Sequence, residues 1–278
     1  MQNKFFIRIE QLFLCQTATE FYGHFDDLYE DFFSSSLVFE HSKPLDSSFL
    51  YHRILGIFAN RECVFSHPTK IRRPNHAKTP LALAKILHSV AHIECSAIFL
   101  ALDAVFRFRG LQQEFYADWL EVAKEEIYHF RLLNGLLEEL GFAYGDFPVH
   151  LNLFEALYAT QHSFKVRMGI VHRGLEAKGL DANPFVIRKI LNSPSKLNPK
   201  IQEVFNIILR DEITHVQKGD KWWKLDTGEQ TPNFLELCKQ YQHFYLTGSI
   251  LNKNARLQAG FSQAELKELE QMNQSKYQ

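Results

Sequence analysis

Apolar side chains recur every three or four residues along most of the chain, which is the spacing of one face of an α-helix. The clearest stripe runs from residue 112 to 140 and is followed by Gly141, a residue type that commonly ends helices. Thr79 and Pro80 predict the start of another long helix, which ends near Arg107. The short connection between them predicts antiparallel neighbours, and the pattern as a whole predicts an all-α protein.

Further helices are predicted on the same grounds. They are two short helices within residues 1–40, one over 47–65, a long one over 151–178 that ends at Gly179, a short one at 185–191, a long one over 200–223, one over 234–247, and a terminal one that starts at a capping box formed by Ser262 and Glu265. The segment 67–74, with Lys70, Arg72 and Arg73, is predicted to be a solvated basic loop.

Charged residues occupy positions in the long stripes where leucines are expected. Glu126 and His129 lie in the stripe of 112–140, Glu212 and His215 in that of 200–223, and Glu94 in that of the helix from Pro80. A buried carboxylate is unfavourable unless it is paired or binds a metal ion. Each Glu-x-x-His pair offers one oxygen and one nitrogen ligand a helical turn apart.

A sixth candidate, Glu176, flanks the stripe of 151–178. Glu155 lies on the same predicted face, but about 30 Å away along the helix axis, so only one of the two can join a site. We prefer Glu176, because Glu155 begins its helix whereas Glu94 lies in the middle of its own. The predicted metal ligands are Glu94, Glu126, His129, Glu176, Glu212 and His215, which is the ligand set of helical di-iron and di-manganese carboxylate bundles.

The alternative is that these residues form buried ion pairs, with Arg131, Arg173 and Arg210 as counter-charges. Other polar or aromatic residues near the stripes are weaker candidates for a role in the site. His88 and His92 are either outer partners of the site or ordinary buried histidines, His172 is a weaker outer candidate, and His162, Tyr128, Trp222 and Trp223 are interpreted as structural.

Composition adds little to this prediction, but it excludes some classes of protein. The chain has 31 basic and 32 acidic side chains, so it has no general field for non-specific nucleic-acid binding. Its four cysteines form no zinc-type spacing and are predicted to be buried thiols in a reducing compartment. The N-terminus does not look like a signal peptide, and no apolar run approaches the roughly 20 residues that cross a bilayer. We expect a soluble cytoplasmic protein.

Several stretches carry a resemblance to a known family. They are AHIE from Ala91, EEIYHFRLL from Glu125, YGDFP from Tyr144, GLEAKGLD from Gly174 and RDEITHV from Arg210. From about Pro74 to Glu270 the chain resembles an uncharacterised bacterial family of ferritin-like proteins, which is similar in turn to MiaE-type tRNA-hydroxylating di-iron enzymes. The resemblance implies a ferritin-like four-helix bundle and the same six ligands. His172 departs from the family pattern, which has proline there.

These observations predict a helical extension over residues 1–75, packed on a di-metal bundle with C-terminal helices over 76–278. The expected function is an O2-dependent di-iron hydroxylase or oxidase with two Fe ions, or Mn instead. Its substrate would be a small molecule or RNA, and it would need an electron donor. The alternatives are a protein that oxidises iron or removes peroxide, and a metal-free helical interaction module.

Overall fold

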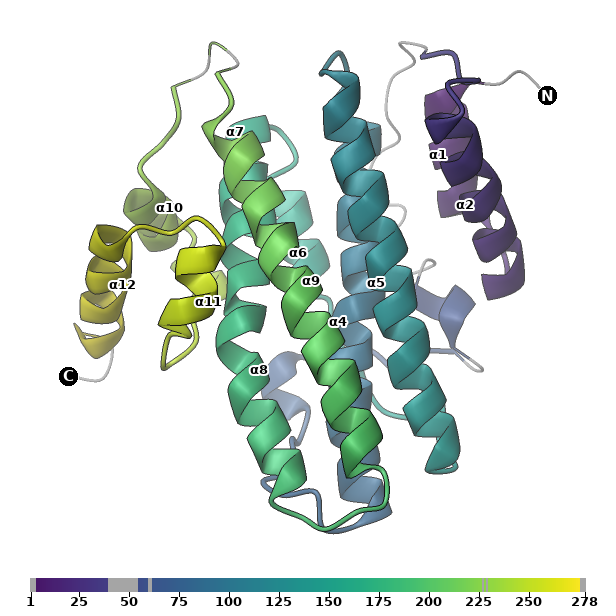
Figure 1. The fold of residues 1–278 in the computed structure, drawn as a ribbon, viewed down its shortest axis with the longest axis vertical. Helices are drawn as coiled ribbons and strands as arrows, with labels where there is room; N and C mark the ends of the chain where they lie inside the picture. Colours follow the sequence, from purple (N-terminus) through teal and green to yellow (C-terminus); the bar gives the residue numbers. More distant parts are fainter. Residues whose placement is uncertain (1–3, 40–54, 60–61, 227, 229, 276–278) are drawn as a thin grey trace. The chain divides into compact units, whose positions relative to one another are not determined.

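Helices dominate the computed structural model, which describes residues 4–39, 55–59, 62–226, 228 and 230–275 (Figure 1). Within those residues, β structure is limited to two isolated bridges, Lys4 with Val38 and Phe65 with Val149. The predicted all-α class is therefore confirmed. The chain divides into two units, residues 1–73 with 87–154 and residues 74–86 with 155–278, and each is described by itself.

The first unit contains the helices before the middle of the chain. In order they are α1 (Phe5–Leu14), α2 (Ala18–Phe33), the 3₁₀ turns η2 (Leu55–Phe58) and η3 (Pro68–Lys70), most of α4 (Pro80–Arg107), α5 (Gln113–Glu139) and the start of α6 (Asn152–Ala159). The two short N-terminal helices, α4 and α5 agree with the predictions. The Thr79 hydroxyl accepts a hydrogen bond from the Ala82 amide and so caps α4, as expected from the sequence.

Phenylalanine rings join the elements of this unit. The ring of Phe21 in α2 lies 5.6 Å from that of Phe99 in α4. Phe58 in η2 contacts both Phe99 and Phe130, at centroid distances of 5.8 and 5.4 Å. Aromatic pairs at such distances stabilise a core beyond the area they bury. The N-terminal helices therefore share one core with α4 and α5.

The segment predicted as a helix over 47–65 is only partly described, because residues 47–54 and 60–61 lie outside the described residues. Its described part is the single turn η2, and the chain then becomes extended up to the bridge between Phe65 and Val149. The Ser66 amide donates to the Val149 carbonyl, and the Val149 amide to that of Val64. The helix prediction was wrong for residues 62–65, because these pairings outweigh a weak local pattern.

Helix α4 is long and apolar enough, by length and composition alone, to cross a membrane. The prediction that no apolar stretch reaches this length was wrong by that measure. However, 83% of the apolar window is buried inside the protein, as in the core helix of a soluble protein.

The second unit holds the remaining helices. They are the rest of α6, α7 (Phe164–Arg167), the π-helix η4 (Met168–Leu175), α8 (Glu176–Leu191), α9 (Asn198–Lys224), α10 (Phe234–Gln240), the 3₁₀ turn η5 (Gln242–Phe244), α11 (Lys253–Gln258) and α12 (Gln263–Ser275). The predicted long helix over 200–223 is confirmed as α9. The terminal capping box is confirmed too, because the Ser262 amide donates to Glu265 and the Glu265 amide to the Ser262 hydroxyl.

Three boundaries in this unit differ from the predictions. The helix predicted over 151–178 is interrupted after Ala159, and Ser163 caps a new start by accepting from the Val166 amide. The new helix does not end at Gly179 but continues to Leu191, so the separate helix predicted at 185–191 is its last part. The helix predicted over 234–247 ends as η5, where Tyr245 adopts a left-handed conformation.

Helix α9 runs alongside the column formed by α7, η4 and α8 (Figure 1). The two approach closely at Gly219, since a Cβ atom there would overlap the carbonyl group of His172 in η4. A π-helix has wider hydrogen-bond rings than an α-helix and often marks a functional site. The absence of a side chain at Gly219 thus allows the π-helix to pack against α9.

Ion pairs tie the C-terminal helices to this column. Arg173 in η4 donates to Asp220 and to Glu265, both at 2.7 Å. Arg256 in α11 forms two hydrogen bonds with Asp181 in α8, at 2.9 and 2.8 Å. These arginines are fully buried, so removal of either partner would leave a charge in the interior.

We expect Gly219→Ala to destabilise the protein by about 1–3 kcal/mol, because the added methyl group must push η4 away from α9. Chemical denaturation followed by circular dichroism measures the difference. The matched control is Gly135→Ala in α5, where a Cβ atom meets nothing within 4 Å. That substitution should leave stability unchanged or raise it by up to about 1 kcal/mol. Equal stability of the two variants would contradict the close packing of η4 and α9.

Candidate metal site

Three of the predicted ligands form one buried group in the first unit. Glu94 comes from α4, and Glu126 and His129 come from α5, where their spacing places them on one face. Nδ1 of His129 lies 3.2 Å from Oε2 of Glu94 and 3.5 Å from Oε2 of Glu126. The three side chains are almost completely buried, and their donor atoms lie within 4.8 Å of one another. Such a group could hold a metal ion.

The electrostatics of this group are unfavourable without a cation. Burial, together with the charge of Glu126, raises the pKa of the Glu94 carboxyl to about 7, although the neighbouring His129 opposes this rise. Two carboxylates that share one imidazole in the interior therefore compete for protons at neutral pH. A divalent cation would reverse this preference, because it stabilises both carboxylates in their charged form.

The second unit repeats the Glu-x-x-His pair on α9. Nδ1 of His215 lies 3.9 Å from Oε1 of Glu212, and both side chains are buried. Oε2 of Glu212 lies 4.0 Å from the position of a Cβ atom at Gly179. Gly179 is one helical turn beyond Glu176, so Glu212 faces the side of α8 on which Glu176 lies.

Glu176 is the first residue of α8 and directly follows the π-helix. It is partly exposed, unlike the other five candidates. Its competitor, Glu155, lies on α6, before the interruption at residues 160–163. The two glutamates therefore lie on different helices. The prediction that both belong to one helix over 151–178 was wrong.

The arginines considered as counter-charges contact other groups. Arg173 pairs with Asp220 and Glu265, and Arg210 pairs with Asp211 on the surface of α9. Arg131 lies over the ring of Tyr22, 5.3 Å from its centre.

His88 and His92 hold the loop that follows α5 against α4. Nε2 of His92 donates to the His150 carbonyl at 2.7 Å, so its Nδ1 accepts from the Tyr144 hydroxyl at 3.0 Å. Nε2 of His88 accepts from the Gly145 amide. Burial lowers the pKa of His92 to about 3 and that of His88 to about 4, so both rings are neutral. Sequence reasoning had not singled out Tyr144 as their partner, although it lies in the stretch YGDFP.

The remaining candidates are placed as follows. His172 is buried in η4, His162 is exposed, Trp222 and Trp223 are buried as predicted, and Lys70, Arg72 and Arg73 are exposed as expected of a solvated loop. Tyr128, which was interpreted as structural, is 50% exposed. It lies on the solvent side of α5, although two buried candidate ligands lie near it in the sequence. All four cysteines are free and buried, as predicted.

The structure thus defines a helical protein with a buried carboxylate and imidazole group that could hold a metal ion. Residues 50–267 match the family described as "Protein of unknown function (DUF455)", and the chain belongs to this family. It is 43% identical over 194 residues to an uncharacterised protein of Haemophilus influenzae. That match covers 66% of each chain, slightly less than two thirds of the relative. No solved structure matches the chain. Membership of an uncharacterised family, predicted from the sequence, is confirmed.

The raised pKa of Glu94 predicts how the metal-free protein responds to pH. In the unfolded chain this carboxyl ionises near 4.5, and in the folded protein near about 7. Its contribution to stability is therefore full below pH 4.5 and is lost as the pH rises to 7. Relative to the wild type, we expect Glu94→Gln to gain up to about 3 kcal/mol in unfolding free energy over this interval.

Denaturation of chelator-treated protein between pH 4.5 and 8 measures this gain. The matched control is Glu138→Gln, an exposed residue of α5, which should stay within about 0.5 kcal/mol of the wild type throughout. A constant difference between Glu94→Gln and the wild type would show that Glu94 is not held against a second carboxylate.

Proposed function

We propose that this protein is a dinuclear metal protein of the ferritin-like type and acts as an O2-dependent di-iron oxidoreductase. Its ligands are Glu94, Glu126 and His129 from the first unit and Glu176, Glu212 and His215 from the second. The proposal includes the ferritin-like four-helix bundle that the sequence predicts. It also includes the predicted division into a helical extension over residues 1–75, packed on the bundle, and a di-metal bundle with C-terminal helices over 76–278.

The observation that carries the proposal is the buried group of Glu94, Glu126 and His129. Two carboxylates next to one imidazole in the interior are costly for a protein that uses them only for stability. The same atoms fit a divalent cation, because carboxylate oxygen and imidazole nitrogen are ligands of iron and manganese. Burial would also exclude water from such a centre.

The second Glu-x-x-His pair supports two metal ions instead of one. Glu212 and His215 reproduce on α9 the arrangement of Glu126 and His129 on α5, with both side chains buried. Bundles with this repeat use one further glutamate from each of the two other helices. Glu94 supplies the first, and Glu176 supplies the second at the end of the π-helix.

Iron ions held by these residues would supply the electrons that reduce O2. The protein contributes the surroundings of this chemistry. The four glutamates would balance the charge of the metals, and the two histidines would supply nitrogen ligands. Buried apolar residues of the same helix face, such as Trp119, Val122 and Leu133, keep bulk water out.

The substrate class follows from the charge of the chain. Basic and acidic residues nearly cancel, so the protein has no general attraction for RNA. A small organic substrate is therefore favoured over RNA, with an electron donor that restores the reduced metals. Four free buried cysteines agree with a reducing compartment such as the cytoplasm. The same ligands accept manganese, which makes the metal the first quantity to measure.

We expect the protein purified without chelators, or loaded anaerobically with Fe(II), to hold about two iron or manganese ions per chain. Glu126→Ala and Glu212→Ala should each lose at least about half of this metal, because each removes a ligand of the centre. Elemental analysis measures the content, and absorption spectra before and after O2 report whether the bound iron is oxidised.

The matched controls are Glu138→Ala on α5 and Glu203→Ala on α9, which remove exposed carboxylates from the same helices. They should keep full metal content. Uptake of many more than two Fe per chain would instead indicate iron storage. Failure of the wild type to bind Fe(II) or Mn(II) would refute the dinuclear site.

A further inference from the structure

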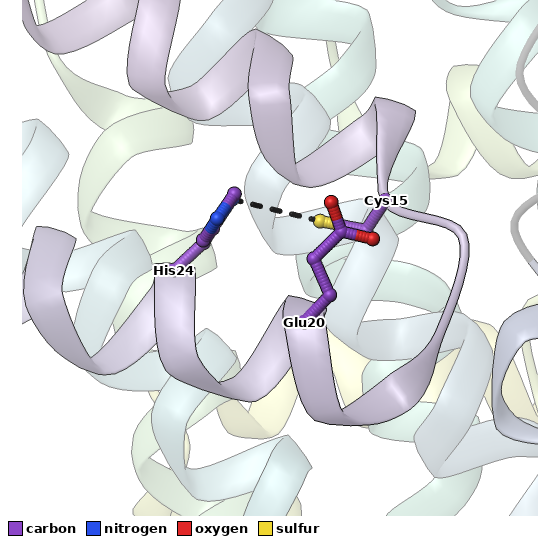
Figure 2. A group of neighbouring side chains, drawn as sticks. All are labelled: Cys15, Glu20 and His24. Atoms are coloured by element: carbon purple, nitrogen blue, oxygen red, sulfur yellow. Dashed lines mark hydrogen bonds between the residues drawn. The ribbon is translucent and has the colours of Figure 1, made fainter. Parts of the chain in front are cut away.

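A second group of potential metal ligands lies in the first unit, where α1 turns into α2. Cys15 follows the last residue of α1, and Glu20 and His24 lie one turn apart in α2 (Figure 2). One donor atom from each residue lies within 4.8 Å of the other two. The three side chains point toward one another, with Sγ of Cys15 3.9 Å from Nδ1 of His24.

The sequence builds this arrangement from a helix cap. Thr17 begins α2, and its hydroxyl accepts from the Glu20 amide at 3.2 Å. Oε2 of Glu20 in turn accepts from the Gln16 amide at 2.7 Å, which is a capping box displaced by one residue. The cap fixes the Glu20 carboxylate beside Cys15 and leaves its Oε1 able to bind a cation. His24 lies four residues further on and therefore on the same face of α2.

Access and protonation are compatible with metal binding. Glu20 and His24 are exposed, so an ion can enter from solvent, whereas Cys15 is buried behind them. The Cys15 thiol donates to the Gln11 carbonyl at 3.3 Å. Burial and the charge of Glu20 raise the pKa of this thiol to about 11, so it keeps its proton when no metal is present. A bound cation lowers the pKa of a coordinating thiol enough to remove that proton.

We propose that Cys15, Glu20 and His24 bind one zinc(II) ion, with water as the fourth ligand. Thiolate, imidazole and carboxylate are the three ligand types that zinc uses in proteins, and three protein ligands with one water form an open tetrahedral site. Binding forms a bond between zinc and sulfur and releases the thiol proton to solvent. The soft sulfur distinguishes this site from the Glu94 group, whose oxygen and nitrogen ligands suit iron or manganese.

Cobalt(II) is the probe, because it replaces zinc and absorbs light when a thiolate binds it. The six ligands proposed for the dinuclear centre include no cysteine, so a thiolate-to-cobalt charge-transfer band reports on a cysteine site alone. We expect this band to saturate at about one Co(II) per chain and to disappear when Zn(II) is added. Zinc binding near pH 7 should release about one proton from the thiol.

His24→Ala and Cys15→Ser test the ligands. We expect Cys15→Ser to abolish the band and His24→Ala to weaken Co(II) binding at least about tenfold. Because His24 is exposed, its replacement leaves the fold intact, as circular dichroism can verify. Glu20→Gln retains an oxygen for the Gln16 amide but loses the charge, and it should also weaken binding.

The matched control is Cys63→Ser, which alters another buried thiol of the same unit and should keep the band. A missing band in the wild type, a band that survives in Cys15→Ser, or equal affinity in His24→Ala would each overturn the zinc site. None of these results bears on the dinuclear centre, whose metal content depends on Glu126 and Glu212.

Discussion

The central constraint on the first unit is the repulsion between two buried carboxylates, which the surrounding packing must overcome. Glu94 and Glu126 meet at one histidine between α4 and α5, where phenylalanines and leucines occupy the neighbouring positions. Water cannot solvate them there. Burial and the charge of Glu126 therefore both raise the pKa of Glu94. The packed aromatic core around these helices holds the carboxylates together against their repulsion. A cation bound between them would relieve this repulsion, which is why the proposed metal centre is assigned to this group.

Helical periodicity predicted the long helices well, because each buries one continuous apolar stripe. It failed where the compensation for a local defect comes from a distant part of the chain. Pro184 lies inside α8 and cannot donate to the Leu180 carbonyl. Asn252, in the turn before α11, donates to that carbonyl instead. A sequence pattern near Pro184 contains no sign of this partner, so the helix was predicted to stop too early.

The candidate ligands, by contrast, could be predicted from the local sequence. Glu126, His129, Glu212 and His215 contradict the apolar stripes around them, and a contradiction of that kind is visible in a single sequence. The π-helix before Glu176 was not predictable, since it depends on the close approach that Gly219 allows from α9. Cys15, Glu20 and His24 were not predicted as a group, because the spacing of the cysteines alone gives no zinc-type pattern. Their signal was a cysteine just before a capped helix that carries glutamate and histidine one turn apart.

The donor chemistry of the two groups in the first unit argues that they serve different metals. The group of Glu94, Glu126 and His129 is enclosed, rich in charge and free of sulfur, which favours a redox metal that needs shielding from water. Cys15 is the buried end of a group whose other members, Glu20 and His24, face solvent. Zinc has no redox chemistry, and a zinc ion with an open coordination position would bind a water molecule and lower its pKa. Under these two proposals the ligand types would direct each metal to its own group, so the two ions would not compete for the same residues.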